Sequence, residues 1–198
     1  MARRTNAGPG GEGQAEAIGS DGVRQIRPQL TAEQVWRAVS RASFAVLGHV
    51  TPTGEPRCSG VVYKVAGHRM VVAVASESWK ARHIAADDRV AVTVTVRRGG
   101  ILSLIAPIPP ATVSFHGTAI AHPAASPRAR SVLDALGSLI PAERRASATV
   151  IEIVPVGAFV TYGLDVPLLK MRDPAVARAR VPVPAEENPH SEQRAQTA

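Results

Sequence analysis

The chain contains several short segments in which apolar residues recur at every second position, separated by polar, turn-forming residues. Such runs, rich in Val and Thr, are typical of β-strands with one buried face. The nearly continuous apolar run at 70–75 predicts a strand that is buried on both faces. In total the pattern predicts strands over residues 43–50, 57–65, 70–75, 90–96, 112–122 and 148–162, the last bent near 155–157.

Three segments have helical character instead. Thr31 and Gln34 form the pattern of a capping box, which predicts a helix over 32–42. A polar turn at 76–78 leads into a second short helix, which ends before two aspartates. The pattern over residues 127–139 predicts a third helix. Because the first three strands are joined by hairpin-length links, βαβ crossovers are excluded there. The order of elements predicts a mainly β (α+β) fold, an antiparallel barrel with short flanking helices.

Composition sets the domain limits. The 198 residues suit one domain, which we place at 29–172, between a disordered N-terminal tail (1–28) and an extended or disordered C-terminal tail (173–198). The apolar loop at 101–110 either covers a ring-shaped ligand or contacts a second chain. No segment resembles a secretory signal or approaches ~18 apolar residues. We therefore expect a cytoplasmic protein without a membrane partner.

The net charge of +7 lies mainly in the predicted domain rather than in the tails, which favours anionic ligands. Aromatic residues make up only 4% of the chain, which argues against a nucleic-acid surface that stacks bases. The single cysteine excludes an internal disulfide, and the six histidines lack the spacing of a metal site. His49 and His116 fall in predicted strands, where we expect hydrogen-bonded barrel histidines rather than ligands.

The turn between the third strand and the second helix carries the most specific chemistry. Ser78 is placed to cap the helix, and Lys80, one of only three lysines against twenty arginines, lies in its first turn. Hydroxyls, free backbone N–H groups and a cation together suit a phosphate. The alternative is an ordinary serine cap followed by solvated basic residues.

Five segments of the chain form a recognisable series: LGHVTPTGEPR at 47–57, MVVAVA at 70–75, SWKA at 78–81, RVAVTV at 89–94 and FHGTA at 115–119. In this order they resemble the pyridoxamine 5′-phosphate oxidase-like, FMN-binding split β-barrel family. About half of the chain is covered, and the order and spacing of the segments are more specific than any one of them. Trp79 departs from the family pattern, which often has arginine there.

The resemblance implies a homodimer with a flavin nucleotide at the subunit interface. Basic and hydroxyl residues of the second strand and of the turn after the third would hold the phosphate, and the backbone of 61–63 would flank the flavin ring. On matching positions, the cofactor-binding residues implied are Arg57, Val61, Val62, Tyr63, Ser76, Ser78 and Lys80.

The implied function is that of a flavin-dependent oxidoreductase, which transfers hydride between FMN and a small organic substrate. The deazaflavin F420 is the alternative cofactor, since its phosphate would also suit a basic groove. No side chain is assigned as an obligatory acid or base. Oxidation of pyridoxine phosphate itself is not expected, because residues 111–112 lack the arginine and glutamine of the true oxidases. The alternative function is a non-catalytic carrier of flavin or haem, with His116 as the candidate haem ligand.

Overall fold

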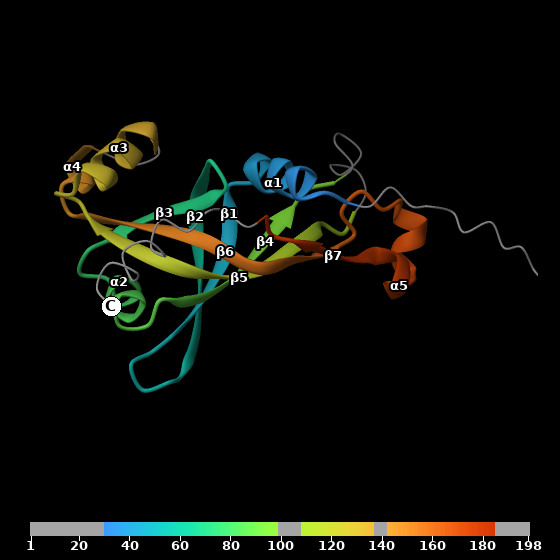
Figure 1. The fold of residues 1–198 in the computed structure, drawn as a ribbon, viewed down its shortest axis with the longest axis horizontal. Helices are drawn as coiled ribbons and strands as arrows, with labels where there is room; N and C mark the ends of the chain where they lie inside the picture. The colour runs from blue at the N-terminus through green and yellow to red at the C-terminus, as the bar shows by residue number, and fades with distance from the viewer. Residues whose placement is uncertain (1–29, 99–107, 137–141, 185–198) are drawn as a thin grey trace, which may run out of the picture.

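The computed structural model describes residues 30–98, 108–136 and 142–184, which form a β-barrel with short helices around it (Figure 1). The sheet has seven strands in the order β3-β2-β1-β4-β5-β6-β7, and an additional β3–β6 pairing closes six of them into a barrel. Every strand pairing is antiparallel, which confirms the predicted fold class. The strands are β1 (Phe44–Val50), β2 (Pro56–Ala66), β3 (Arg69–Ala75), β4 (Arg89–Val96), β5 (Ala111–Pro123), β6 (Ala148–Tyr162) and β7 (Arg178–Pro182).

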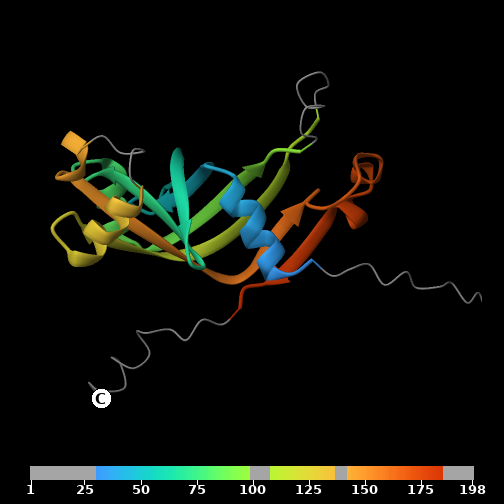
Figure 2. The same cartoon turned by 90° about the horizontal axis from the view of Figure 1, so that it is seen from above.

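The helices lie at the two ends and on one side of the barrel. Figures 1 and 2 show α3 and α4 at one end of the molecule and α5 at the other, while α1 crosses the strands between them. The helices are α1 (Ala32–Arg41), α2 (Trp79–Ala86), α3 (Pro127–Leu136), α4 (Ala142–Arg145) and α5 (Pro174–Ala177), with a 3₁₀ turn, η3 (Leu168–Arg172). None of these described helices has the length and apolar character needed to cross a membrane.

The capping box predicted for α1 is present. Thr31 Oγ1 accepts a hydrogen bond from the Gln34 backbone N–H at 3.3 Å, and Gln34 Oε1 accepts one from the Thr31 N–H at 2.8 Å. Both bonds satisfy N–H groups that a helix start leaves unpaired. The apolar face of α1, with Val35 and Trp36, enters the main core inside the barrel.

Strand β3 is buried on both faces, as its apolar run predicted. Met70 and Val72 belong to the main core, whereas Val71 packs in a second cluster against α3. That second cluster lies outside the barrel, because its β6 members alternate with those that face the interior. Helix α3 therefore covers the outer side of the β3–β6 seam.

The barrel opens along one seam, between β2 and β3. These strands are paired only from Tyr63 to Ala66 on β2 and from Arg69 to Val72 on β3. Beyond this point β2 stays with β1 over Pro56–Val62, while β3 pairs with β6 as far as Ala75. The two strands thus diverge, and α2 begins four residues after the end of β3.

The long strand β6 bends where the sequence indicated. Its register against β5 shifts between Ser114 and His116, opposite a stretch that contains Gly157 with φ +77°. A positive φ is readily adopted by glycine, so this residue permits the bulge. After the bend, β6 pairs with β7, which extends the sheet past residue 172, where the sequence placed the end of the domain. Strand β7 has only five residues, two of which are arginines, and Val181 is its buried residue. Its pattern of apolar residues was therefore too short to predict a strand.

Candidate functional site

The turn after β3 is built by short-range hydrogen bonds from its serines. Ser78 Oγ accepts a hydrogen bond from the Ala81 backbone N–H at 3.3 Å, which makes Ser78 the N-cap of α2, as predicted. Ser76 Oγ accepts a hydrogen bond from Thr149 Oγ1 at 3.0 Å, which ties the turn to β6. Because each serine oxygen only accepts in these bonds, both hydroxyl protons remain available to a further acceptor.

Next to this turn lies a cluster of three rings and one ammonium group. The His49 ring of β1 lies 5.1 Å from the Trp79 ring and 5.4 Å from the His83 ring, both on α2. Lys80 Nζ lies 5.6 Å from the centroid of the Trp79 ring, within range of a cation–π interaction. In the described part of the chain, no carboxylate pairs with Lys80 or with either histidine.

His49 is buried without a hydrogen bond, which corrects the expectation of a hydrogen-bonded barrel histidine. Its side chain is 2% exposed, and neither ring nitrogen has a partner with hydrogen-bond geometry among the described residues. Burial, followed by the charges of His83 and Lys80, lowers the pKa of His49, while the nearby Leu47 backbone offsets this in part. The imidazole is therefore held neutral, and two buried polar atoms point into this end of the barrel.

Arg57 lies on the same side of the sheet as His49. The two residues are direct partners in the β1–β2 ladder, and opposed residues of an antiparallel pair project to the same face. The guanidinium is exposed and donates to Glu55 at 3.1 Å, in a solvated ion pair. The structure therefore brings Arg57 to the side of the barrel where Trp79 contacts His49.

The three predicted ring-flanking residues have different surroundings. Val61 and Tyr63 are buried, and the Tyr63 hydroxyl donates to the Val39 carbonyl at 2.6 Å, so their side chains are part of the core. Val62 points outward and is 58% exposed. The Tyr63 N–H donates to the Ser43 carbonyl of the chain before β1, so by ladder alternation the backbone groups of Val62 face away from β1, toward the open seam.

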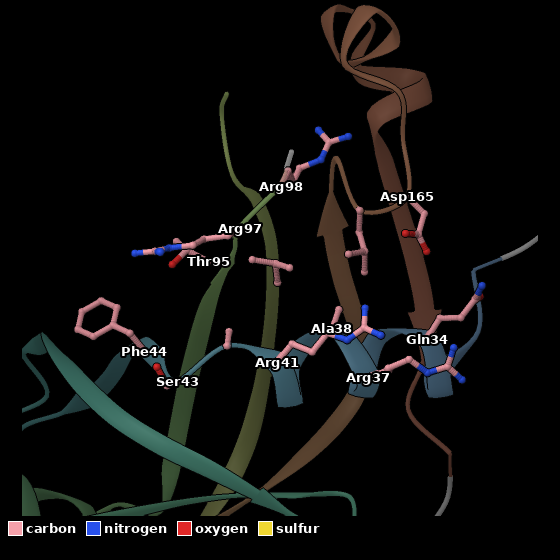
Figure 3. Close-up of a pocket in the computed structure, with 13 residues that line it drawn as sticks. Gln34, Arg37, Ala38, Arg41, Ser43, Phe44, Thr95, Arg97, Arg98 and Asp165 are labelled. Carbon is pink, nitrogen blue, oxygen red and sulfur yellow. The ribbon is translucent and has the colours of Figure 1, made fainter. Parts of the chain in front are cut away.

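A separate cleft lies at the other end of β1, and none of the predicted cofactor residues lines it (Figure 3). It is bordered by α1, by Phe44 at the start of β1 and by the end of β4, and its volume is about 1020 Å³. Phe44 and His49 are five residues apart on one strand, so at ~3.3 Å per residue the cleft and the α2 turn are roughly 17 Å apart.

The outer face of the sheet is uncharged along one row that crosses five strands. Val46, exposed at 38%, lies between Gly60 and Thr93, and Ser114 and Val160 continue the row as far as the charged Arg180 of β7. Phe44 and Val62, which are direct partners in the β1–β2 ladder, expose further apolar surface beside this row. Exposed apolar side chains that gather on one face of a sheet are typical of a protein contact.

His116 also lies on this outer face, and its side chain is exposed. Its neighbours in the sheet are Ala91 and Val156. Within the described ranges, no group of three or more His, Cys, Asp and Glu side chains is placed to hold a metal ion. The predicted 101–110 loop lies largely outside the described residues.

The family model for pyridoxamine 5′-phosphate oxidase matches residues 31–161, about two thirds of the chain. The chain belongs to the pyridoxamine 5′-phosphate oxidase family. This match confirms the family suggested by the sequence segments and spans all elements from α1 to β6. No curated protein matches the chain.

Solved structures with the same fold are named for different ligands. HutZ, a haem storage protein from Vibrio cholerae, is 13% identical with a TM-score of 0.52, over 67% of this chain and 95% of its own. A haem-binding protein from Mycobacterium smegmatis is 18% identical with a TM-score of 0.52, over 70% and 55%. An FAD-binding protein from Mesorhizobium loti is 16% identical with a TM-score of 0.51, over 64% and 90%. These similarities show the fold that this family member shares with them.

Two features of this member of the pyridoxamine 5′-phosphate oxidase family were not found from the sequence. The burial of His49 without a hydrogen-bond partner depends on how α2 packs against β1. Alternation along a strand can predict only whether its side chain points inward. The cleft at α1 joins residues far apart in the chain, such as Arg41 and Asp165. The four-residue spacing of Arg37 and Arg41, which places both side chains on one face of a helix, could have indicated a basic surface at this cleft.

Proposed function

We propose that the protein is a flavin-dependent oxidoreductase that binds FMN, or alternatively F420, and transfers hydride to or from a small organic substrate. It acts as a homodimer with the cofactor at the subunit interface. The phosphate lies at the start of α2, beside Lys80.

The observation that carries this proposal is the Lys80 ammonium group without a counter-charge, beside a buried imidazole without a hydrogen-bond partner. Lys80 lies beside Trp79 and has no carboxylate partner among the described residues, and the neighbouring His49 presents two unpaired ring nitrogens. A buried polar group without a partner costs about 1–3 kcal/mol. A bound phosphate at this position would relieve part of that cost, because it accepts hydrogen bonds and compensates the ammonium charge.

Neighbouring side chains could donate hydrogen bonds to the remaining oxygens of such a phosphate. Ser76 and Ser78 each retain a hydroxyl proton to donate, and Arg57 adds a guanidinium from the facing strand. The Arg57 pair with Glu55 is largely exposed, so exchanging that carboxylate for a phosphate costs little. The backbone of Val62, which faces the open seam, would lie along the flavin ring.

When bound, the flavin supplies the hydride chemistry. The protein's part is to bind the phosphate, orient the ring along β2 and exclude water from it. Trp79, which is partly exposed beside Lys80, offers an apolar face at the same site. We assign no side chain as a proton donor or acceptor in the reaction.

Titration of the purified protein with FMN and with F420, followed by flavin fluorescence and absorption, tests the proposal. We expect binding at micromolar concentrations, and Lys80→Gln should weaken it by about tenfold, the equivalent of ~1.4 kcal/mol. Lys64→Gln is the matched control, since Lys64 is an exposed lysine near the end of β2. No binding of either cofactor would refute the proposal, and equal affinities of both variants would place the phosphate elsewhere.

The homodimer would use the outer sheet face. The row from Gly60 through Val46 to Val160, with Phe44 and Val62 beside it, carries no charge before Arg180 of β7 and offers the apolar centre that a protein interface needs. Because this face adjoins β2, a second chain placed on it would border the open seam where the flavin ring is proposed.

A second candidate is a carrier that holds haem or flavin without turnover. Two of the solved structures with this fold are named as haem-binding or haem storage proteins, and His116 is exposed on the outer face here. Haem titration should then give a Soret band that His116→Ala removes and His68→Ala retains. A flavin spectrum that is reduced by substrate, with no Soret band, would exclude this candidate.

A further inference from the structure

The cleft beside α1 is strongly positive and is separate from the α2 turn. One side is formed by a stripe of α1, in which Gln34, Arg37 and Arg41 share a face at helical spacing (Figure 3). The end of β4 forms another side, with Arg97 and Arg98. Four guanidinium groups thus border one cavity, whose only acidic lining residue in the described chain is Asp165.

The four arginines are not equally available. Arg98 donates to the Val166 carbonyl and to the Met171 sulfur, so it holds the chain after β6 in place. For Arg37, Arg41 and Arg97, no hydrogen bond or ion pair occurs within the described residues. As far as the described residues show, these three cations are therefore available to bind a ligand.

Local helix physics accounts for only part of this arrangement. Arg41 lies in the last turn of α1, where a cation is favoured by the helix dipole. Arg37, one turn earlier, repels it, since like charges four residues apart destabilise a helix by a few tenths of a kcal/mol. Arg97 adds a third charge from a different element, at the same cavity. An anion between α1 and β4 would convert this repulsion into attraction.

We propose that this cleft is a second anion-binding site, which takes a small molecule with two or more carboxylate or phosphate groups. Guanidinium groups form paired hydrogen bonds with either oxyanion, and three free arginines on two sides of the cavity favour a ligand with more than one charge. The volume of about 1020 Å³ accommodates a metabolite-sized molecule. Ala38 and Leu164 provide apolar surface for the uncharged part of such a ligand.

Calorimetric titration of the full chain with citrate and with tripolyphosphate tests the inference without any flavin. We expect at least one of the two to bind, and the tighter one identifies the oxyanion class. The double variant Arg37→Gln/Arg41→Gln should weaken this binding at least tenfold, and Arg97→Gln, on β4, should weaken it independently. Arg130→Gln is the matched control, because Arg130 is exposed on α3 at the far end of the molecule.

The same titration separates this site from the proposed flavin site. Lys80→Gln should leave citrate and tripolyphosphate binding unchanged, whereas it weakens FMN binding if the proposed function is right. Loss of tripolyphosphate binding in Lys80→Gln alone would overturn the inference and place the anion at α2. The inference would also be overturned if neither probe binds, or if Arg130→Gln weakens binding as much as Arg37→Gln/Arg41→Gln does. Tighter binding of a short DNA duplex than of either probe, at the same ionic strength, would overturn it as well.

Discussion

Arg128, at the start of α3, donates from Nε to the carboxylate of Glu152 on β6 at 2.5 Å. Glu152 is 1% exposed, and its other oxygen accepts a hydrogen bond from Arg69 of β3 at 3.3 Å. His122 of β5 lies 3.7 Å from the same oxygen. One buried carboxylate therefore joins α3 to three strands at the seam that closes the barrel.

Glu152 should make the stability of the protein dependent on acid pH. Burial alone would raise the pKa of Glu152, but the hydrogen bond and charge of Arg128, the hydrogen bond of Arg69 and the charge of His122 outweigh it and lower the pKa. A lowered carboxylate pKa contributes stability that is present above the unfolded-state value of about 4.3 and is lost as the pH falls through the folded-state value.

Glu152→Gln should lower the free energy of unfolding by roughly 1.5–3 kcal/mol at pH 7, because charged hydrogen bonds are lost. Urea unfolding between pH 7 and pH 3 would measure this, and the difference from the unsubstituted protein should shrink toward the acid end. Glu143→Gln, at an exposed position of α4, serves as the control. A constant difference at every pH would contradict the assignment of the acid dependence to Glu152.

Lys80 should contribute to the lowered pKa of His49. Its charge is one of the causes that lower the pKa of His49, after burial and His83. Lys80→Gln should therefore raise this pKa, which NMR titration of the imidazole signals can follow. Lys64→Gln should not move it. An unchanged His49 pKa in Lys80→Gln would mean that the ammonium lies farther from β1 than the contact with Trp79 indicates.

Much of this fold could be predicted from the sequence because its signals are local. The capping box at Thr31, the alternation along the strands and the serine cap of α2 depend on neighbouring residues, and all were confirmed. Strand β7 gave no such signal: it is short, and pairing with β6 rather than its own pattern makes it a strand. Its position in the sheet depends on the bend of β6 after the Ser114 register shift.

The candidate site was only partly predictable for a related reason. The residues of one turn, Ser76 to Lys80, are neighbours in the sequence, so their proximity could be inferred. The packing of His49 against α2 and the meeting of Arg97 with α1 at one cleft are tertiary relationships. Strand alternation gives the direction of a side chain, but not whether a polar group finds a partner there.

Replacing His49 by an apolar ring should stabilise the protein. Neither ring nitrogen has a partner among the described residues, so His49→Phe removes an uncompensated polar group and should add roughly 1–2 kcal/mol to the free energy of unfolding. The lowered pKa means that the unfolded chain binds a proton below about pH 6.5 while the folded chain resists it. The gain should therefore increase as the pH falls from 7 to 5, as measured by urea unfolding; a gain that decreases would contradict it.

Gly117 should tolerate no side chain. A Cβ at this position would lie 2.5 Å from the Val154 carbonyl oxygen, a backbone atom of the neighbouring strand β6 that cannot easily move. Gly117→Ala should thus lower the free energy of unfolding by roughly 1–3 kcal/mol. Gly48, also within a strand, is the matched control, because its Cβ would make ordinary contacts of 3.5–3.7 Å. Equal effects of the two substitutions on thermal unfolding would contradict this account.

The outer sheet face should govern the oligomeric state. Val46 lies in the uncharged row of the outer face, flanked by Gly60 and Thr93 on the neighbouring strands, so Val46→Lys would place a charge at the centre of the proposed interface. Burying an unpaired charge is costly, and we expect a monomer by analytical ultracentrifugation. Leu169→Lys is the control, since Leu169 is 86% exposed on η3, which is not one of the strands that form that face, and should leave the dimer intact.

Because the flavin is proposed to bind between the two chains, Val46→Lys should also weaken FMN binding, although Val46 lies outside the phosphate turn. A dimeric Val46→Lys variant would locate the interface elsewhere, whereas a monomer with full FMN affinity would show that one chain suffices for the cofactor.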